Sequence, residues 1–302
     1  MCYTKEALIC RRKCRFAAQI RRGKRLKLSI KVKGENIMPA VYAHYLFGKK
    51  VYKALPEAEK RIVRRGKDAF LIGLHGPDLL FYYRPFGKNR INQQGTRMHR
   101  ELAASFFEKG KEEYRKDYDP VLRAYLYGFL CHFILDSECH PYIGCYMEEH
   151  SLGHLEIETD FERYLLEKNG HDPLHYVPTH HLISRRHTRE QISRMFEDVS
   201  PRQIDVCIKM FRRVIAFFIC ASPVKRRILR TVSRVTGQDK ELGGLIMDGI
   251  VHPGCGESND FLEERMEASV ETAVQEIVNY SRVLEGKGLL SIRLYRDYEE
   301  TI

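Results

Sequence analysis

One segment, CHFILDSECHPY at residues 131–142, limits what this chain can fold into more than any other. It places His132, Asp136 and His140 at four-residue steps among Leu, Ile, Phe and Cys. Residues four apart lie on the same face of an α-helix, so these polar groups would share one face of a buried helix. Burying them unpaired is costly, and we therefore expect them to bind a metal ion or to satisfy one another in the core.

The composition shows how unusual this spacing is. With 13 His and 40 Asp and Glu in 302 residues, a His followed four residues later by an acid is expected about 1.7 times. The pair occurs twice, at His132/Asp136 and His154/Glu158, so each pair alone is a weak signal. The triple is expected only about 0.07 times, which leaves a metal site and a satisfied polar cluster as comparable interpretations.

Helical spacing of apolar residues predicts an all-α fold from Met38 onward, and no strand is strongly indicated. Asp119-Pro120 is typical of a helix start, and Pro141 is expected to end the same helix because its ring interrupts the hydrogen-bond ladder. The loops at 75–95 and 169–181 are rich in Gly, Pro, Asn and His, which is typical of loops that line a site. The predicted helices cover 39–54, 57–73, 96–115, 120–139, 152–168, 188–197, 201–221, 224–236 and 259–285.

The positive charge is concentrated at one end. Residues 1–37 hold twelve Lys and Arg and two Glu, a net charge of +10, whereas the whole chain carries +11. The sequence KGENIM at 33–38 can be encoded by a purine-rich bacterial ribosome-binding sequence, so translation is predicted to begin at Met38. Residues 1–37 are then a disordered or artefactual extension before one helical domain at 38–302; the alternative is a basic arm that binds anionic lipid or nucleic acid.

The remaining composition favours a protein of a reducing compartment. Nine Cys, an odd number without a repeating spacing, argue against a disulfide framework. No apolar run approaches the length of a membrane span, and 1–37 lacks the apolar core of a secretory signal. We therefore expect a cytoplasmic location.

Further candidate metal ligands appear in order along the chain. His44 lies in AVYAHYLFG, Asp78 in the Gly-Pro-Asp turn of GLHGPDLL, and His99 in TRMHREL. The pair His154/Glu158 follows in GHLEIETDFERYLL. Imidazole nitrogen combined with carboxylate oxygen is typical of zinc sites, and the lack of paired Cys favours a catalytic site over a structural one.

This ordered set resembles the zinc-dependent phospholipase C family, which includes the catalytic domain of bacterial phospholipase C toxins. The resemblance covers 38–168 and implies a compact all-α domain of the zinc phospholipase C and single-strand nuclease type. It also implies two or three Zn²⁺ ions per chain and metal-activated water that attacks the phosphorus of a phospholipid or related phosphodiester. The implied ligand sets are His99, His132 and Asp136 for one ion, His140, His154 and Glu158 for a second, and His44 with a shared Asp136 for a third, with Asp78 as general base.

Two departures from the family pattern affect individual ligands. The extracellular enzymes of the family complete the third zinc site with an N-terminal Trp, and this chain has no Trp. A start at Met38 would expose Pro39 as an amino terminus that could take that place. The spacing from Asp136 to His140 is shorter than in the toxins, so His150 is a substitute ligand, and His75 is expected just outside the ligands.

Two other functions compete with a phospholipase. A single-strand-specific zinc nuclease uses nearly the same ligands, but the near-neutral body of the chain disfavours nucleic acid as a partner. The other alternative is a helical protein that binds metal without turnover, or one whose C-terminal half, 182–302, is a helical interaction module. A phospholipid or small phosphodiester is the expected substrate. Because the toxins' membrane-binding β-sandwich has no counterpart here, access to bilayer lipid is not explained; peripheral contact with a membrane is one route, and a soluble or monomeric substrate is the alternative. Four His in the 169–181 loop, His171, His175, His180 and His181, are expected at the surface.

Overall fold

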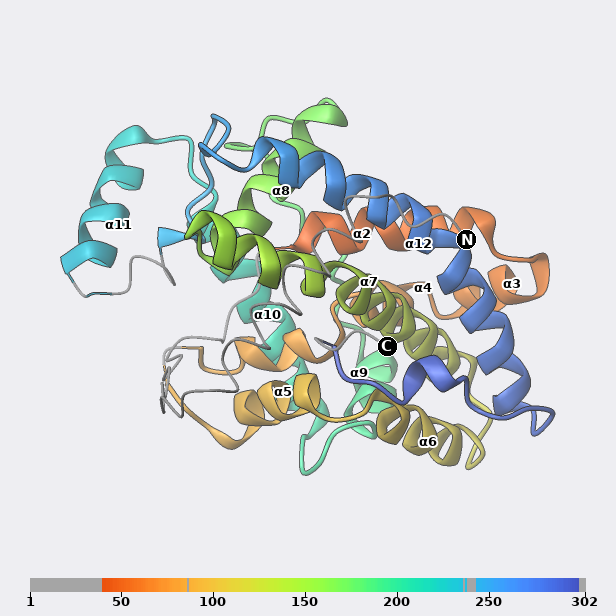
Figure 1. Ribbon diagram of the computed structural model, residues 1–302. Helices are drawn as coiled ribbons and strands as arrows, with labels where there is room; N and C mark the ends of the chain where they lie inside the picture. The colour runs from red at the N-terminus through yellow and green to blue at the C-terminus, as the bar shows by residue number, and fades with distance from the viewer. Residues whose placement is uncertain (1–39, 86, 236, 238–242, 299–302) are drawn as a thin grey trace, which may run out of the picture.

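Helix α7 (Pro120–His150) runs through the middle of the molecule, and most of the other helices pack against it (Figure 1). The structure, a computed structural model, describes residues 40–85, 87–235, 237 and 243–298. These residues contain no strand, and the predicted all-α fold is confirmed. The other helices are α2 (Val41–Ala54), α3 (Glu57–Arg65), α4 (Lys67–Gly73), the 3-10 helix η1 (Gly76–Tyr82), α5 (Arg90–Arg100), α6 (Ala103–Tyr114), α8 (His154–Lys168), α9 (Arg186–Ser193), α10 (Pro201–Phe218), α11 (Pro223–Val235), α12 (Gly256–Leu284) and η3 (Ile292–Leu294).

The first half of α7 is buried on every side. Its side chains from Leu122 to Ser137 are all buried, and they include the apolar run that the sequence shows around His132. Helices α3, α4, α9 and α12 cover it from several directions. A helix enclosed in this way shows little amphipathic pattern, because there is no solvent face to carry polar residues.

Glycines let α4 and α7 approach until their backbones touch. A Cβ atom built on Gly128 would lie 2.1 Å from the carbonyl oxygen of Phe70, and one on Gly73 would lie 2.4 Å from the carbonyl oxygen of Tyr125. Only a residue without a side chain fits at such a crossing. The crossing fixes α4, and therefore the turn that follows it, against the centre of α7.

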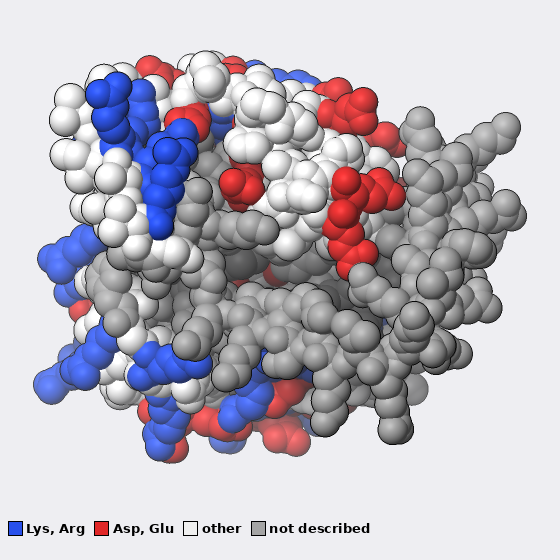
Figure 2. All heavy atoms as spheres, turned by 60° about the vertical axis from the view of Figure 1, so that its left-hand side comes forward, with Lys and Arg blue, Asp and Glu red and all other residues white. Residues whose placement is uncertain are grey.

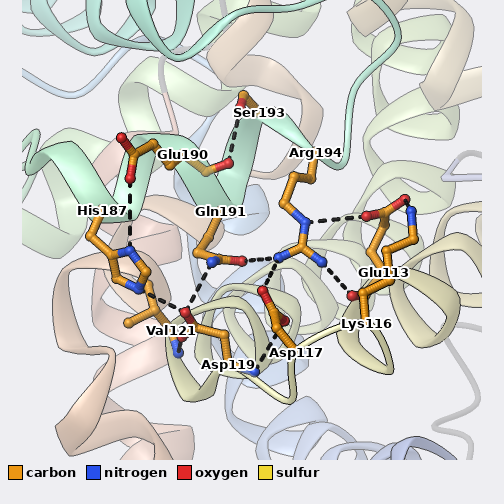
Figure 3. Close-up of polar contacts among 10 residues, drawn as sticks. All are labelled: Glu113, Lys116, Asp117, Asp119, Val121, His187, Glu190, Gln191, Ser193 and Arg194. Atoms are coloured by element: carbon orange, nitrogen blue, oxygen red, sulfur yellow. Dashed lines mark hydrogen bonds and ion pairs between the residues drawn. The ribbon is translucent and has the colours of Figure 1, made fainter.

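The start of α7 is held by α9. The carboxylate of Asp119 caps α7 by accepting a hydrogen bond from the backbone N–H of Val121 (2.7 Å). The same carboxylate accepts from Nε2 of Gln191 (2.9 Å) and lies 2.7 Å from Nε2 of His187 (Figure 3). Directly after α9, the guanidinium of Arg194 binds the carboxylates of Glu113 in the last turn of α6 and of Asp117 in the loop before α7.

Two expectations about helix ends were wrong. Helix α7 does not end at Pro141 but continues to His150, because the segment beyond the proline packs into the core through Tyr142 and Tyr146. The ring of Tyr142 stacks on Phe261 of α12 at 3.9 Å between centroids. This packing outweighs the hydrogen bond that proline removes. The single helices expected at 57–73 and 96–115 are each divided in two, at Gly66 and near Glu101.

The site-bearing helices α2 and α8 lie together beside α12 (Figure 1). Cysteines in the described residues are free, as the count predicted: Cys131, Cys139, Cys145, Cys207, Cys220 and Cys255. Within the same residues no helix is long and apolar enough to cross a membrane. The expected start at Met38 and the basic segment 1–37 lie outside the described residues.

The contact between α4 and α7 predicts opposite effects for two glycines of the same helix. Gly128→Ala forces the two backbones apart and is expected to lower the free energy of unfolding by about 1–3 kcal/mol. Gly144→Ala, where a Cβ meets nothing within 4 Å, should raise it by about 0.5–1 kcal/mol. Denaturant unfolding of the two variants measures both values. Equal effects would show that the helices do not touch as described.

Candidate metal centre

Five helical elements bring the predicted ligand side chains to one buried place. Helix α7 supplies three of them from one face, as their four-residue spacing requires. The structure groups every residue for which a metal role was predicted from the motif order, although these residues span more than a hundred positions of the chain. They are His44 on α2, Asp78 on η1, His99 on α5, His132, Asp136 and His140 on α7, and His154 and Glu158 on α8.

The first group consists of His99, His132 and Asp136, whose ligand atoms all lie within 4.8 Å of one another. Nε2 of His132 is 3.0 Å from Oδ2 of Asp136. His99 is oriented by its other ring nitrogen, because Nδ1 lies 2.8 Å from the carbonyl oxygen of Gly95. A backbone contact of this kind fixes the tautomer that leaves Nε2 free to bind a metal.

The second group consists of His140, His154 and Glu158. Oε1 of Glu158 lies 3.0 Å from Nε2 of His154 and 3.6 Å from Nε2 of His140. His140 also lies 3.9 Å from Oδ1 of Asp136, so it stands between the two carboxylates. The expected helix end at Pro141 would have placed His140 in the last turn of the helix. Because α7 continues to His150, His140 instead lies within a continuous helix.

The third group consists of His44, Asp78 and His132. Nε2 of His44 also lies 3.2 Å from Oδ1 of Asp136, which agrees with the predicted sharing of that carboxylate. Asp78 was predicted as a base, and the structure adds that it lies within reach of the metal groups, with Oδ1 3.0 Å from Nε2 of His99. The first and third groups share His132, and the second group adjoins them because His140 lies 3.9 Å from Asp136, so the three groups form one continuous cluster.

The buried ligand atoms of this cluster fit a metal ion better than they fit one another. Several are close to an opposite partner, yet among the described residues they make no hydrogen bond of acceptable geometry. Leaving buried nitrogen and oxygen atoms in this state is costly unless a cation accepts their lone pairs. The donor set of imidazole and carboxylate suits Zn²⁺. These atoms are Nε2 of His99, His132 and His154, Oδ1 of Asp78, Oδ2 of Asp136 and Oε2 of Glu158.

Electrostatics keep the carboxylates ionised. Burial opposes ionisation of Asp136, but the surrounding imidazoles of His132, His140 and His44 outweigh it and hold its pKa well below the usual value. Burial likewise opposes ionisation of Glu158, and His154 and His140 together lower its pKa to about 2. Both side chains are therefore available as anionic ligands across the physiological pH range.

Glu162 supports this cluster and was missed in the sequence. It continues the spacing of His154 and Glu158 by one more helical turn, which was the available signal. Its carboxylate accepts hydrogen bonds from the backbone N–H groups of Tyr42 (2.8 Å) and Ala43 (2.7 Å) at the start of α2. Glu162 thereby ties α2 to α8 and fixes the helix turn that carries His44.

His75 and His181 form a buried pair beside the cluster. Their Nε2 atoms are 2.8 Å apart, and the His75 ring lies 6.4 Å from the His44 ring between centroids. Burial lowers the pKa of His75 well below its usual value and lowers the pKa of His181 to about 3, so both rings are neutral. His75 thus lies just outside the ligands as expected, whereas the surface position expected for His181 was wrong because Tyr45 stacks on it.

The predicted substitute ligand His150 is not part of the cluster. His150 is exposed at the end of α7, where its ring stacks on Tyr146 at 4.0 Å between centroids. The described residues thus bring His140, not His150, to the second group. Pro39 lies outside the described residues.

His154 has the most exposed side chain of the cluster. The side chain of His154 is 31% exposed, whereas that of its partner Glu158 is 6% exposed and that of His132 is fully buried.

Comparison with known proteins identifies the family. The family model for zinc-dependent phospholipase C matches residues 43–214. This range is more than half of the 302-residue chain and contains every residue of the cluster, so the chain belongs to the zinc-dependent phospholipase C family. No curated protein and no solved structure matches the chain.

Zinc affinity should depend on pH because protons occupy the metal-free site. Burial opposes protonation of His140, but the carboxylates of Asp136 and Glu158 raise its pKa to about 9. Zinc must displace this proton, so the affinity is expected to fall by about tenfold per pH unit between about pH 9 and 6. Competition with a zinc-binding dye at several pH values measures the slope. An affinity independent of pH over this range would contradict the assignment of His140.

The two His of the second half of α7 provide a direct test of ligand identity. His140→Ala should lose about one zinc ion per chain and weaken binding by several orders of magnitude, because a buried ligand is removed. His150→Ala is the matched control on the same helix and should keep the wild-type zinc content. Metal analysis of the purified variants decides between them, and the reverse pattern would make His150 the ligand.

Proposed function

We propose that this protein is a zinc-dependent phosphodiesterase that hydrolyses a phospholipid or a related phosphodiester, in the manner its family name describes. The observation that carries the proposal is the buried cluster itself, in which carboxylates and imidazoles from five helical elements converge with unsatisfied ligand atoms. A core that only needed stability would not contain such groups without hydrogen bonds. Family membership supports the same conclusion.

The cluster would hold two or three zinc ions. His99, His132 and Asp136 are proposed for the first, and His140, His154 and Glu158 for the second. His44 with the shared Asp136 is proposed for a third. Bound zinc would lower the pKa of a water molecule and neutralise the charge that develops on the phosphodiester.

Asp78 is proposed as the base of the reaction. It lies in a buried 3-10 turn, and a carboxylate held there can accept a proton from the attacking water. Water would add to phosphorus, and the bond from phosphorus to the leaving oxygen would break opposite it. The products are an alcohol, which takes up a proton, and a phosphate monoester.

The turn that carries Asp78 is held in place by its neighbours. Gly76 has a positive φ of +42°, and a Cβ atom there would lie 2.0 Å from the His132 ring. Only glycine allows the turn to approach the ligand so closely. Phe81 and Tyr82, which follow, are buried core residues.

A single-strand nuclease remains the competing function. The body of the chain is nearly neutral, whereas a groove that follows nucleic acid is basic and lined by stacking aromatic side chains. Hydrolysis of phosphatidylcholine, a soluble chromogenic phosphodiester and single-stranded DNA under one set of conditions compares the candidates directly. Preferential cleavage of DNA would overturn the phospholipase proposal.

The Asp78→Asn variant tests whether Asp78 acts as a general base or as a metal ligand. The amide has the same shape but accepts protons poorly, so kcat is expected to fall by about a hundredfold to ten-thousandfold. Zinc content should stay near that of the wild type, because the other cluster residues remain. His150→Ala is again the control and should keep full activity. Loss of zinc in parallel with activity would instead show that Asp78 acts as a metal ligand.

A further inference from the structure

Helix α11 turns its apolar side chains toward solvent. Val224, Ile228, Val232 and Val235 follow one another at three- and four-residue steps and therefore lie on one face of the helix. Their exposed fractions are 68%, 57%, 50% and 82%. A helix of a globular protein normally buries such a face against the core.

The polar side of α11 faces the protein instead. Ser233 is buried, and the guanidinium of Arg230 forms an ion pair with Asp248 in the loop that follows. Nη1 of Arg226 donates hydrogen bonds to the carbonyl oxygens of Cys220 (2.7 Å) and Ala221 (2.9 Å). Because these contacts fix the rotation of the helix, the outward position of the apolar face is determined by the fold.

Helix α11 also carries basic side chains next to its apolar face. Helix α11 carries Lys and Arg at five of its thirteen positions and no acidic residue, in a chain whose body is nearly neutral. Lys225 and Arg227 lie on the two sides of the apolar stripe at about 100° per residue. In Figure 1 the helix lies at the outer left edge, and Figure 2, which brings that side forward, shows Lys and Arg side chains beside uncharged surface.

We propose that α11 docks the protein on an anionic membrane surface. An apolar stripe bordered by basic side chains is the pattern of a helix that lies in the headgroup region of a bilayer. The apolar side chains would enter the boundary with the acyl chains while the basic groups contact lipid phosphates. Phe217, 49% exposed beneath the ammonium of Lys225, extends the apolar surface.

This docking surface is connected to the metal centre, and the inference rests on the proposed function for its purpose. The segment after α11 packs on the first turns of α8, where the hydroxyl of Thr159 donates to the carbonyl oxygen of Gly244 (2.6 Å). The same turns carry His154, a candidate ligand whose side chain is partly exposed. Docking through α11 would therefore hold the most exposed side chain of the cluster near the lipid.

Vesicle sedimentation of the full-length protein tests the proposal. Wild-type protein should bind vesicles of phosphatidylcholine mixed with phosphatidylglycerol more tightly than phosphatidylcholine alone, and added salt should weaken the binding. Ile228→Asp should reduce binding to the mixed vesicles by about tenfold or more, because it places a charge in the apolar stripe. Arg227→Glu should lower the preference for the anionic lipid.

Leu289→Asp provides the matched control. Leu289 is 87% exposed beyond the far end of the 29-residue helix α12, so this variant should bind vesicles as the wild type does. Equal binding by Ile228→Asp and wild type, or no binding by the wild type, would overturn the proposal. A wild-type dimer that Ile228→Asp dissociates would assign the surface to a second copy and would also overturn it.

Assays with a soluble substrate test membrane docking through α11 and the proposed phosphodiesterase activity independently. Ile228→Asp should hydrolyse a short, monomeric phosphodiester at the wild-type rate and lose activity only on lipid in vesicles. Absence of hydrolysis by the wild type on every phosphodiester would contradict the proposed function while leaving the vesicle binding intact. Slower hydrolysis of the soluble substrate by Ile228→Asp would show that α11 acts on the site itself, and docking would then be rejected.

Discussion

The carboxylate of Asp136 is the constraint on which the rest of the structure depends. It is buried at the centre of α7, and imidazoles from α2 and α7 surround it at 3.0–3.9 Å. An isolated charge at such a depth would be very unfavourable, so the fold must supply compensating positive charge. The surrounding His side chains supply part of it, and a bound zinc ion would supply the rest.

Several features of the fold serve to keep this arrangement in place. The glycine crossing of α4 and α7 sets the Asp78 turn against His132, and the cap of Glu162 sets the start of α2 beneath His44. Each contact joins residues that are distant in the sequence, so the site exists only in the complete fold. The C-terminal helix α12 contributes by packing against α2, α7 and α8 together.

The sequence predicted the all-α fold, and it singled out the His, Asp and Glu residues that converge in the structure, because both depend on local spacing and on the order of motifs. It failed where tertiary packing outweighed a local rule: stacking of Tyr142 carries α7 through Pro141, and Tyr45 buries His181. Glu162 was missed although it continues the four-residue spacing of His154 and Glu158, because the backbone N–H groups that it binds leave no mark in a sequence. The outward rotation of α11 was equally hidden, since an amphipathic pattern does not state which face meets the core.

The central claim is that zinc occupies the cluster around Asp136, and anomalous X-ray diffraction at the zinc absorption edge tests it most directly. Crystals of the purified protein should show one strong peak among His99, His132 and Asp136 and another among His140, His154 and Glu158. His132, Asp136 and His140 lie on one face of α7, so the two peaks should lie on that face. The account would be contradicted if neither place showed a peak after zinc had been supplied and the imidazoles were hydrogen-bonded to neighbouring side chains instead.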